Sequence, residues 1–114
     1  MSGGVFPISD LDTKRALIAA TTSGAHTVVA AIAGKRIRVT QVVLIADDVT
    51  TVKFQSHTTP TDLTGTLSLG AHTGFAPGWE PNGHFETLTG EALDINLGSS
   101  SIVGGWLTYL EIWP

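Results

Sequence analysis

The sequence consists largely of short segments in which apolar and polar residues alternate, and glycine-containing turns separate these segments at short intervals. Residues 92–98 are the clearest case, because every second residue there is apolar, namely Leu93, Ile95 and Leu97. A period of two residues places the apolar and polar sets on opposite faces of a β-strand. The repetition of such segments along 114 residues predicts an all-β fold.

Further strands are expected wherever β-branched and aromatic residues gather between turn residues. These segments are 26–32, 36–46, 50–56, the region of 63–69, 84–88 and 102–113. The stretch 70–83, GAHTGFAPGWEPNG, holds glycine and proline too densely for regular structure and predicts a long loop.

The segment before the first turn is ambiguous. Ser9 followed by Asp12 matches a weak helix-capping pattern, which favours a short helix. Because Ala16-Leu17-Ile18 leads directly into the turn residues Thr21 to Gly24, we prefer a strand from about Lys14. Residues 1–13 are then predicted to form an N-terminal arm, and residues 14–114 the β-sandwich domain.

About eight short strands without a long helix indicate an antiparallel β-sandwich, and a jelly-roll-like arrangement is the natural form for that number. An immunoglobulin-type sandwich is the alternative, but the chain has no cysteine and so lacks the disulfide framework of that fold.

The last strand, 102–113, is apolar on both of its faces. Trp106, Leu110 and Ile112 share one face, while Leu107, Tyr109 and Trp113 share the other. An antiparallel strand commonly exposes one face to water, so we expect this strand to be central and its outer face to be covered by a second copy of the chain. Within the strand, Gly104-Gly105 predicts a bulge.

The second half of segment 36–46 is also apolar on both faces. The residues expected in an oligomer interface are therefore Trp106, Leu110, Ile112, Val42 and Leu44.

The charge content supports an association of this kind. Only 14% of the residues are charged, against about 25% in an ordinary soluble domain. The formal net charge of −4 argues against nucleic-acid binding, which needs a basic surface. Residues 1–57 carry six positive and four negative charges, whereas residues 58–114 carry six negative charges and none positive. This asymmetry is either chance or a head-to-tail attraction between subunits.

Patterns that indicate catalysis or metal binding are absent from the sequence. The four histidines stand outside any HExxH-type spacing, and no GxSxG element is present. Asp47-Asp48 occupies an expected turn, where aspartate is favoured for its local hydrogen bonds. We therefore expect no enzyme activity, no cofactor and no bound metal. No secretory leader or membrane-spanning run is recognisable, so we expect synthesis in the cytoplasm and no membrane partner.

Two places in the chain offer apolar anchors for a partner. Trp79 and Glu80 lie in the 70–83 loop, where tryptophan serves equally well as an anchor in a protein pocket or as a platform for a sugar. Phe6 and Ile8 lie in the predicted arm. All four residues are candidates for contact with a larger assembly.

Several strings resemble a family of small proteins encoded by tailed bacteriophages and prophages. They are KRALI (14–18), TVVAAIAGKRIRV (27–39), TDLTGTLSL (61–69), GHFETLTGEALDINL (83–97) and LTYLEI (107–112). The GKRIRV string and the Phe85-Glu86-Thr87 step are the most specific of them. The stretch GWEPNGH departs from the family pattern, so Trp79, Glu80 and His84 are particular to this chain.

The resemblance implies a virion protein of the capsid decoration or cement kind. Such a protein is a homotrimer with a jelly-roll-like sandwich, it binds the major capsid protein on the capsid exterior, and it stabilises contacts between capsomers. The resemblance supplies no catalytic residues. A tail-fibre or host-attachment module that binds surface glycans remains the alternative, and a small histidine-dependent β-enzyme is a third hypothesis.

Overall fold

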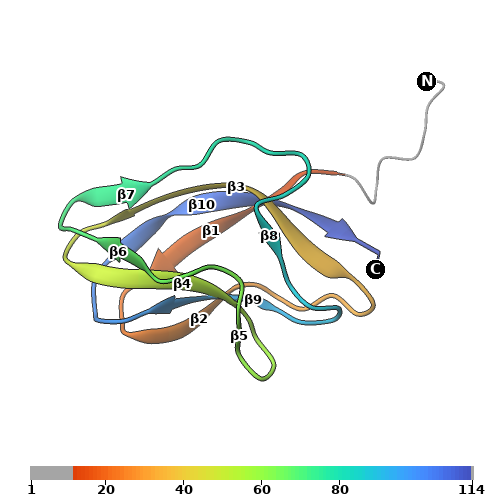
Figure 1. Ribbon diagram of the computed structural model, residues 1–114, viewed down its shortest axis with the longest axis horizontal. Helices are drawn as coiled ribbons and strands as arrows, with labels where there is room; N and C mark the ends of the chain where they lie inside the picture. Colours follow the sequence, from red (N-terminus) through yellow and green to blue (C-terminus); the bar gives the residue numbers. More distant parts are fainter. Residues whose placement is uncertain (1–11, 114) are drawn as a thin grey trace.

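The computed structural model describes residues 12–113, and these residues form two antiparallel β-sheets packed face to face, with no helix among them (Figure 1). This arrangement confirms the predicted all-β fold and its β-sandwich form. The predicted arm, residues 1–13, falls almost wholly outside the described residues, and so do Phe6 and Ile8.

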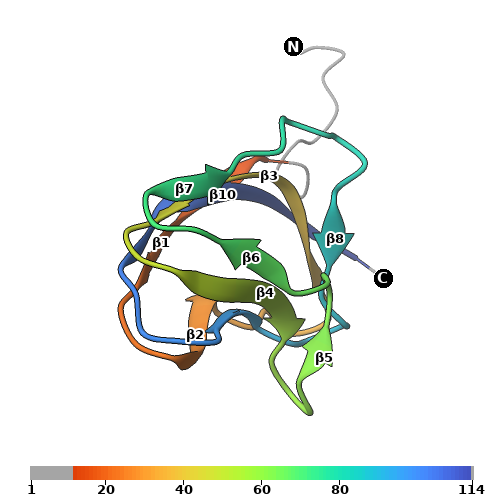
Figure 2. The ribbon, with the colours of Figure 1, turned by 60° about the vertical axis from the view of Figure 1, so that its left-hand side comes forward.

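Each sheet contains five strands. Sheet A has the order β1 (Lys14–Ala20), β10 (Val103–Ile112), β3 (Arg36–Ala46) and β7 (Thr73–Phe75), and β8 (Phe85–Glu86) also pairs with β3. Sheet B has the order β2 (Gly24–Val29), β9 (Leu93–Leu97), β4 (Thr50–Ser56) and β5 (Thr61–Asp62), and β6 (Leu67–Leu69) also pairs with β4. Figure 2 shows the two sheets as separate layers that enclose the core.

The predicted strand from Lys14 is confirmed, because β1 begins at that residue. The predicted loop 70–83 contains one short strand, β7, which pairs with the end of β3. Gly74 makes this pairing possible, since a Cβ atom there would collide with the carbonyl oxygen of Leu44. A three-residue strand with a central glycine has too little β character to be recognised from sequence.

The core lies between the sheets and is built from the alternate apolar residues of both. Phe54 of β4 is fully buried, and its ring centroid lies 5.0 Å from that of Phe85 in β8. The other large buried side chains include Ile37, Leu93, Ile95, Leu97 and Leu107. The alternation of 92–98 therefore points as the sequence predicts, with Leu93, Ile95 and Leu97 inward.

A bulge in β3 changes which residues of that strand face the core. Thr108 of β10 lies opposite Gln41, and the next residue, Tyr109, lies opposite Val39, so Thr40 is an extra residue in β3. Inward-facing positions are odd before the bulge and even after it. Val42 and Leu44, which were expected at an interface, are instead core residues with 0% and 1% exposure.

The bulge predicted at Gly104-Gly105 is wrong. The pairing of β10 with β3 runs without interruption through both glycines. Gly105 is required by close backbone approach, because a Cβ atom there would collide with the carbonyl oxygen of Val43.

Candidate interaction surface

The outer face of sheet A, which points away from sheet B, carries two neighbouring rows of residues that run across the strands. The first, which we call the bulky row, consists of Leu17, Trp106 and Val43, which lie opposite one another on β1, β10 and β3. The second, which we call the small row because three of its four residues are alanine or glycine, consists of Ala19, Gly104 and Gly74 on β1, β10 and β7, with the larger Ile45 on β3.

These rows expose apolar area to solvent. Leu17 is 74% exposed and Ile45 is 57% exposed, while Trp106 and Val43 are half-buried. Ile102, which precedes β10 at the same end of the sheet, is 60% exposed. A contiguous apolar area on a sheet face is typical of a surface that binds a partner.

The loop between β7 and β8 follows the edge of sheet A beside β3 and presents Trp79. The backbone N–H of Glu80 donates to the carbonyl oxygen of Thr40 at 2.8 Å, and that of His84 donates to Val39 at 2.7 Å. The His84 ring hydrogen-bonds the carbonyl oxygen of Gly78 at 2.7 Å. These bonds fix the loop on both sides of Trp79, which is itself 59% exposed. A fixed, exposed tryptophan loses little entropy on binding.

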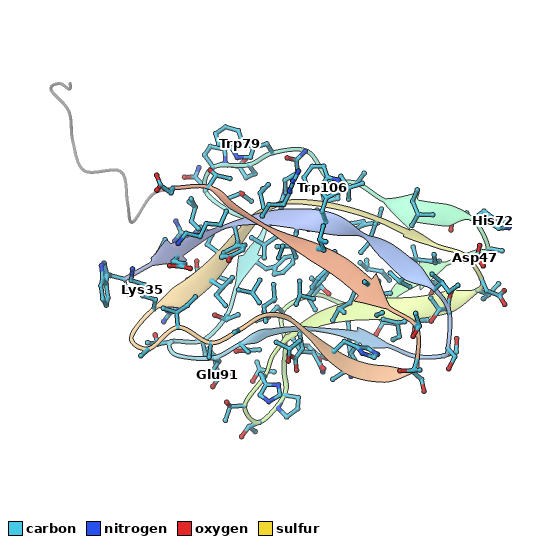
Figure 3. All side chains as sticks on the ribbon, turned by 180° about the vertical axis from the view of Figure 1, so that it is seen from behind. Lys35, Asp47, His72, Trp79, Glu91 and Trp106 are labelled. Atoms are coloured by element: carbon cyan, nitrogen blue, oxygen red, sulfur yellow. The ribbon has the colours of Figure 1, made fainter. Side chains whose placement is uncertain are left out.

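Trp79 and Trp106 lie on the same side of the molecule, as the view from behind shows (Figure 3). The pinned loop therefore extends the apolar surface of the sheet beyond its edge. We call the two rows together with Trp79 the apolar surface.

The residues predicted for an interface are divided by the fold. Trp106, Leu110 and Ile112 share the outer face of sheet A and are half-buried, whereas Val42 and Leu44 belong to the core. The residues of β3 that replace them on the outer face are Val43 and Ile45. Glu80 is half-buried, and its carboxylate accepts a hydrogen bond from the backbone N–H of Asn82 at 2.9 Å, so this side chain helps to shape the loop.

The charge asymmetry of the sequence is largely neutralised within the molecule. Bases from the first half pair with acids from the second half: Lys14 with Glu111 at 3.1 Å, Arg36 and Arg38 with Glu86 at 3.0 Å, and Lys53 with Asp62 at 3.3 Å. The two sheets bring these halves together, since β10 lies between β1 and β3, and β9 lies between β2 and β4. The asymmetry therefore needs no partner subunit to explain it.

Two ionisable groups at one end of sheet A, Lys14 and Tyr109, have raised pKa values. The hydrogen bond with Glu111 raises the pKa of the Lys14 ammonium group. Desolvation by burial, followed by the negative charge of Glu111, raises the pKa of the Tyr109 hydroxyl above its ordinary value of 10.0. Tyr109 faces inward and packs against the core, which accounts for the desolvation.

The outer face of sheet B is polar, in contrast to that of sheet A. One row across its strands consists of Thr27, Asp94, Gln55 and Asp62. Gln55 donates a hydrogen bond to Asp62 at 2.8 Å, and this bond, with that from Lys53, lowers the pKa of the Asp62 carboxyl. The side chains of this row are polar and hydrogen-bond one another, so the row offers no apolar area to a partner.

One histidine–aspartate pair on sheet B was missed by the sequence analysis. The His57 ring nitrogen Nδ1 lies 2.6 Å from Asp94 Oδ2, and the Thr27 hydroxyl donates to Asp94 Oδ1 at 3.0 Å. Asp94 is buried while the His57 side chain is 57% exposed. A histidine oriented by an aspartate can act as a general base, either on a bound molecule or on a nucleophilic side chain beside its outer nitrogen. Among residues 12–113 the His57 ring hydrogen-bonds Asp94 alone, and no group of three metal-ligating side chains is present.

The remaining histidines have separate partners. His72 lies 3.5 Å from Asp47 at one end of the molecule, and His26 hydrogen-bonds the carbonyl oxygen of Thr22 at 2.7 Å. The part of the chain that the structure describes encloses no ligand-sized cavity. Nor do these residues include a helix able to cross a membrane.

Family models, curated proteins and solved structures were compared with the chain, and none matches. We therefore take the apolar surface on sheet A as the candidate site, because of its exposed apolar side chains and their arrangement in rows.

Proposed function

We propose that the protein is a structural virion protein that decorates the outside of a bacteriophage head and stabilises contacts between capsomers. It works by binding the major capsid protein rather than by catalysis. The observation that carries the proposal is the outer face of sheet A, where two in-register rows and the pinned Trp79 form one exposed apolar surface. The resemblance of the strand and turn strings to phage virion proteins supports a phage capsid as the assembly that this surface binds.

A jelly-roll arrangement belongs to the same proposal. β5 and β6 both pair with β4 and can be counted as one interrupted strand, and β7 and β8 both pair with β3 and can be counted as another. Each sheet then has four strands, in which strands from the first half of the chain alternate with strands from the second half. This alternation is typical of a jelly roll and supports that form of the sandwich. We further propose that the protein decorates the capsid as a homotrimer, as the resemblance implies.

Repetition explains how a surface of modest size is sufficient for this function. A capsid presents the same binding site many times, so weak contacts from linked copies combine into high avidity. Trp79 is the residue best placed to act as the anchor of each contact, since it is exposed and held by hydrogen bonds on both sides.

Co-sedimentation of the full chain with expanded capsids tests the proposal. The unaltered protein is expected to co-sediment, and Trp79→Ala is expected to weaken binding by about tenfold or more, as for an interface hot spot. Leu88→Ala is the matched control, because Leu88 is an exposed apolar residue outside the apolar surface and is 43% exposed. A protein that never co-sediments with capsids would rule the proposal out.

A glycan-binding attachment module is the second candidate, and the exposure of Trp79 favours it. Aromatic rings stack on the apolar faces of sugars, and Asn82 and Glu80 lie in the same loop. A glycan array with the unaltered protein and Trp79→Ala separates the two functions. Binding that is lost in Trp79→Ala supports the module, whereas an array without any signal removes it.

A further inference from the structure

Gly104 on the outer face of sheet A is not explained by the packing of a single chain. A Cβ atom at this position would meet only the carbonyl oxygen of Ile18, at 3.9 Å, which is ordinary van der Waals contact. Gly105 and Gly74, by contrast, would collide with backbone atoms. The single chain therefore has room for a Cβ atom at position 104, and the glycine leaves a hollow in the outer face where even this atom is missing.

The hollow at Gly104 lies beside a row of larger side chains on the same face. Gly104 and Ala19 belong to the small row, and Trp106 and Leu17 occupy the same two strands in the adjacent bulky row. Rows on one face of a strand are about 7 Å apart, since successive residues rise about 3.4 Å. An indole and a glycine therefore stand next to each other on the exposed face.

We propose that two copies of the chain pair through the outer faces of their A sheets, with the bulky row of each copy on the small row of the other. The two-fold axis lies in the interface, runs across the strands and passes between the two rows. This symmetry places the bulky row of one copy over the small row of the other, and it places each strand opposite the same strand of the second copy. Trp106 then covers Gly104 of the second copy, Leu17 covers Ala19, and Val43 meets Ile45.

The charged groups around the rows fit this symmetry. Arg15 is exposed and lies one row beyond the bulky row on β1. Asp47, whose side chain is 59% exposed, directly follows β3 and lies one row beyond the small row. Because each strand lies opposite its own copy, Arg15 faces Thr21 of the second copy and Asp47 faces Gln41. Neither charge therefore meets a like charge across the contact, which is compatible with this register.

The pairing adds to the proposed role in capsid assembly, and its biological purpose rests on that proposed function. The contact itself needs no capsid and can be measured with the free protein. A trimer requires different, head-to-tail contacts. The face-to-face contact would then join copies of neighbouring trimers, so the expected masses are those of a dimer or of a hexamer. On a capsid, the paired rows would then tie adjacent decoration units to each other, and Trp79, on the loop beside the sheet, would be left to contact the capsid.

Sedimentation of the full chain over a range of concentrations tests the pairing. The unaltered protein is expected to form a dimer or hexamer as concentration rises. Gly104→Leu fills the hollow, and Leu17→Glu places a charge on the bulky row, so each is expected to raise the dissociation constant by about tenfold or more. Gly65→Leu is the matched control, because a Cβ atom at Gly65 meets nothing within 4 Å and the residue lies in the turn between β5 and β6, away from this face.

Thermal unfolding shows whether a variant still folds. If Gly104→Leu unfolds, Leu17→Glu decides, because Leu17 is 74% exposed and its replacement leaves the core intact. A strictly monomeric or strictly trimeric unaltered protein would overturn the pairing. Loss of pairing in Gly65→Leu to the same degree as in Gly104→Leu would overturn the assigned face.

Spin labels test the geometry independently, since the chain contains no cysteine of its own. Labels attached at Thr21→Cys, an exposed position that follows β1 just beyond the small row, are expected to show dipolar coupling between copies, whereas labels at Gly65→Cys are not. The reverse pattern would contradict the proposed face. A monomeric protein that still binds capsids would remove the pairing alone, whereas a paired protein that never binds capsids would remove the decoration function alone.

Discussion

At the scale of single residues, neighbouring apolar positions on β3 have opposite roles. Leu44 is 1% exposed and packs in the core, while the next residue, Ile45, is 57% exposed on the outer face. The two side chains have the same size, so their contributions to stability differ through environment alone. The extra residue Thr40 in β3 sets this assignment.

Substitution of these two residues by alanine tests the assignment. Leu44→Ala is expected to lower the free energy of unfolding by about 2–5 kcal/mol, because it leaves a cavity in a close-packed core. Ile45→Ala is expected to change it by no more than about 0.5 kcal/mol in the unpaired chain. Chemical denaturation of dilute protein measures both. Equal losses would contradict the bulge at Thr40.

Tyr109 gives a second prediction at this scale, because its raised pKa makes stability depend on pH. Below pH 10 both the folded and the unfolded chain keep the hydroxyl proton. As the pH rises past the ordinary tyrosine pKa of 10.0, the unfolded chain loses this proton first, so unfolding becomes more favourable up to the raised pKa of the folded state. Tyr109→Phe is expected to reduce this alkaline loss of stability.

The chain contains a single tyrosine, so its absorbance on ionisation reports Tyr109 alone. The midpoint of that titration is expected at a higher pH in the folded protein than in denaturant. Identical midpoints in the two states would show that the hydroxyl is not desolvated.

At the scale of the elements, alternation predicts the strands but not the face that each residue takes. Segments with a clear polar face, such as β9, are oriented as the sequence predicts. In β3 the run Val42 to Ile45 is apolar at every position, so either set of alternate residues could face inward. The register is decided by pairing with β10, and that contact depends on residues far away in the chain.

The candidate surface was predicted only in part for the same reason. Trp106, Leu110 and Ile112 were assigned to one face from β10 alone, and their alternation holds because the bulge lies in the partner strand. The His57–Asp94 pair joins β9 to the residue that follows β4, so only the sheet pairing reveals it. No local pattern could indicate either the small row or the fixed position of Trp79.

The two glycines of β10 provide a prediction about this element. Gly105→Ala is expected to destabilise the protein by more than about 1 kcal/mol, because its Cβ atom collides with the Val43 carbonyl oxygen. Gly104→Ala is expected to be neutral or slightly stabilising, since the position is open and alanine restricts the unfolded chain. Thermal unfolding compares the two, and a larger loss in Gly104→Ala would contradict the backbone arrangement described for β10.

At the scale of the whole molecule, each sheet draws strands from both halves of the chain. Sheet A contains β1 and β3 from the first half with β10 from the second, and sheet B contains β2 and β4 with β9. Neither half can bury its apolar residues alone, so unfolding is expected as a single cooperative transition.

Fragments of the chain test this interdependence. Residues 1–57 and residues 58–114, prepared separately, are each expected to give the circular dichroism spectrum of an unfolded peptide. Mixing them is expected to restore β structure, because all contacts between the sheets become available again. A fragment that folds by itself would show that the two halves are independent units.

The central place of β10 also has a consequence during synthesis. β1 and β3 pair with β10 on its two sides, so they cannot join into one sheet until β10 has been made. A nascent chain therefore emerges from the ribosome with the centre of sheet A missing, and its apolar strands stay open to chaperones until β10 is translated. A premature stop anywhere before residue 103 would leave a polypeptide that lacks the strand between β1 and β3 and cannot complete sheet A by itself.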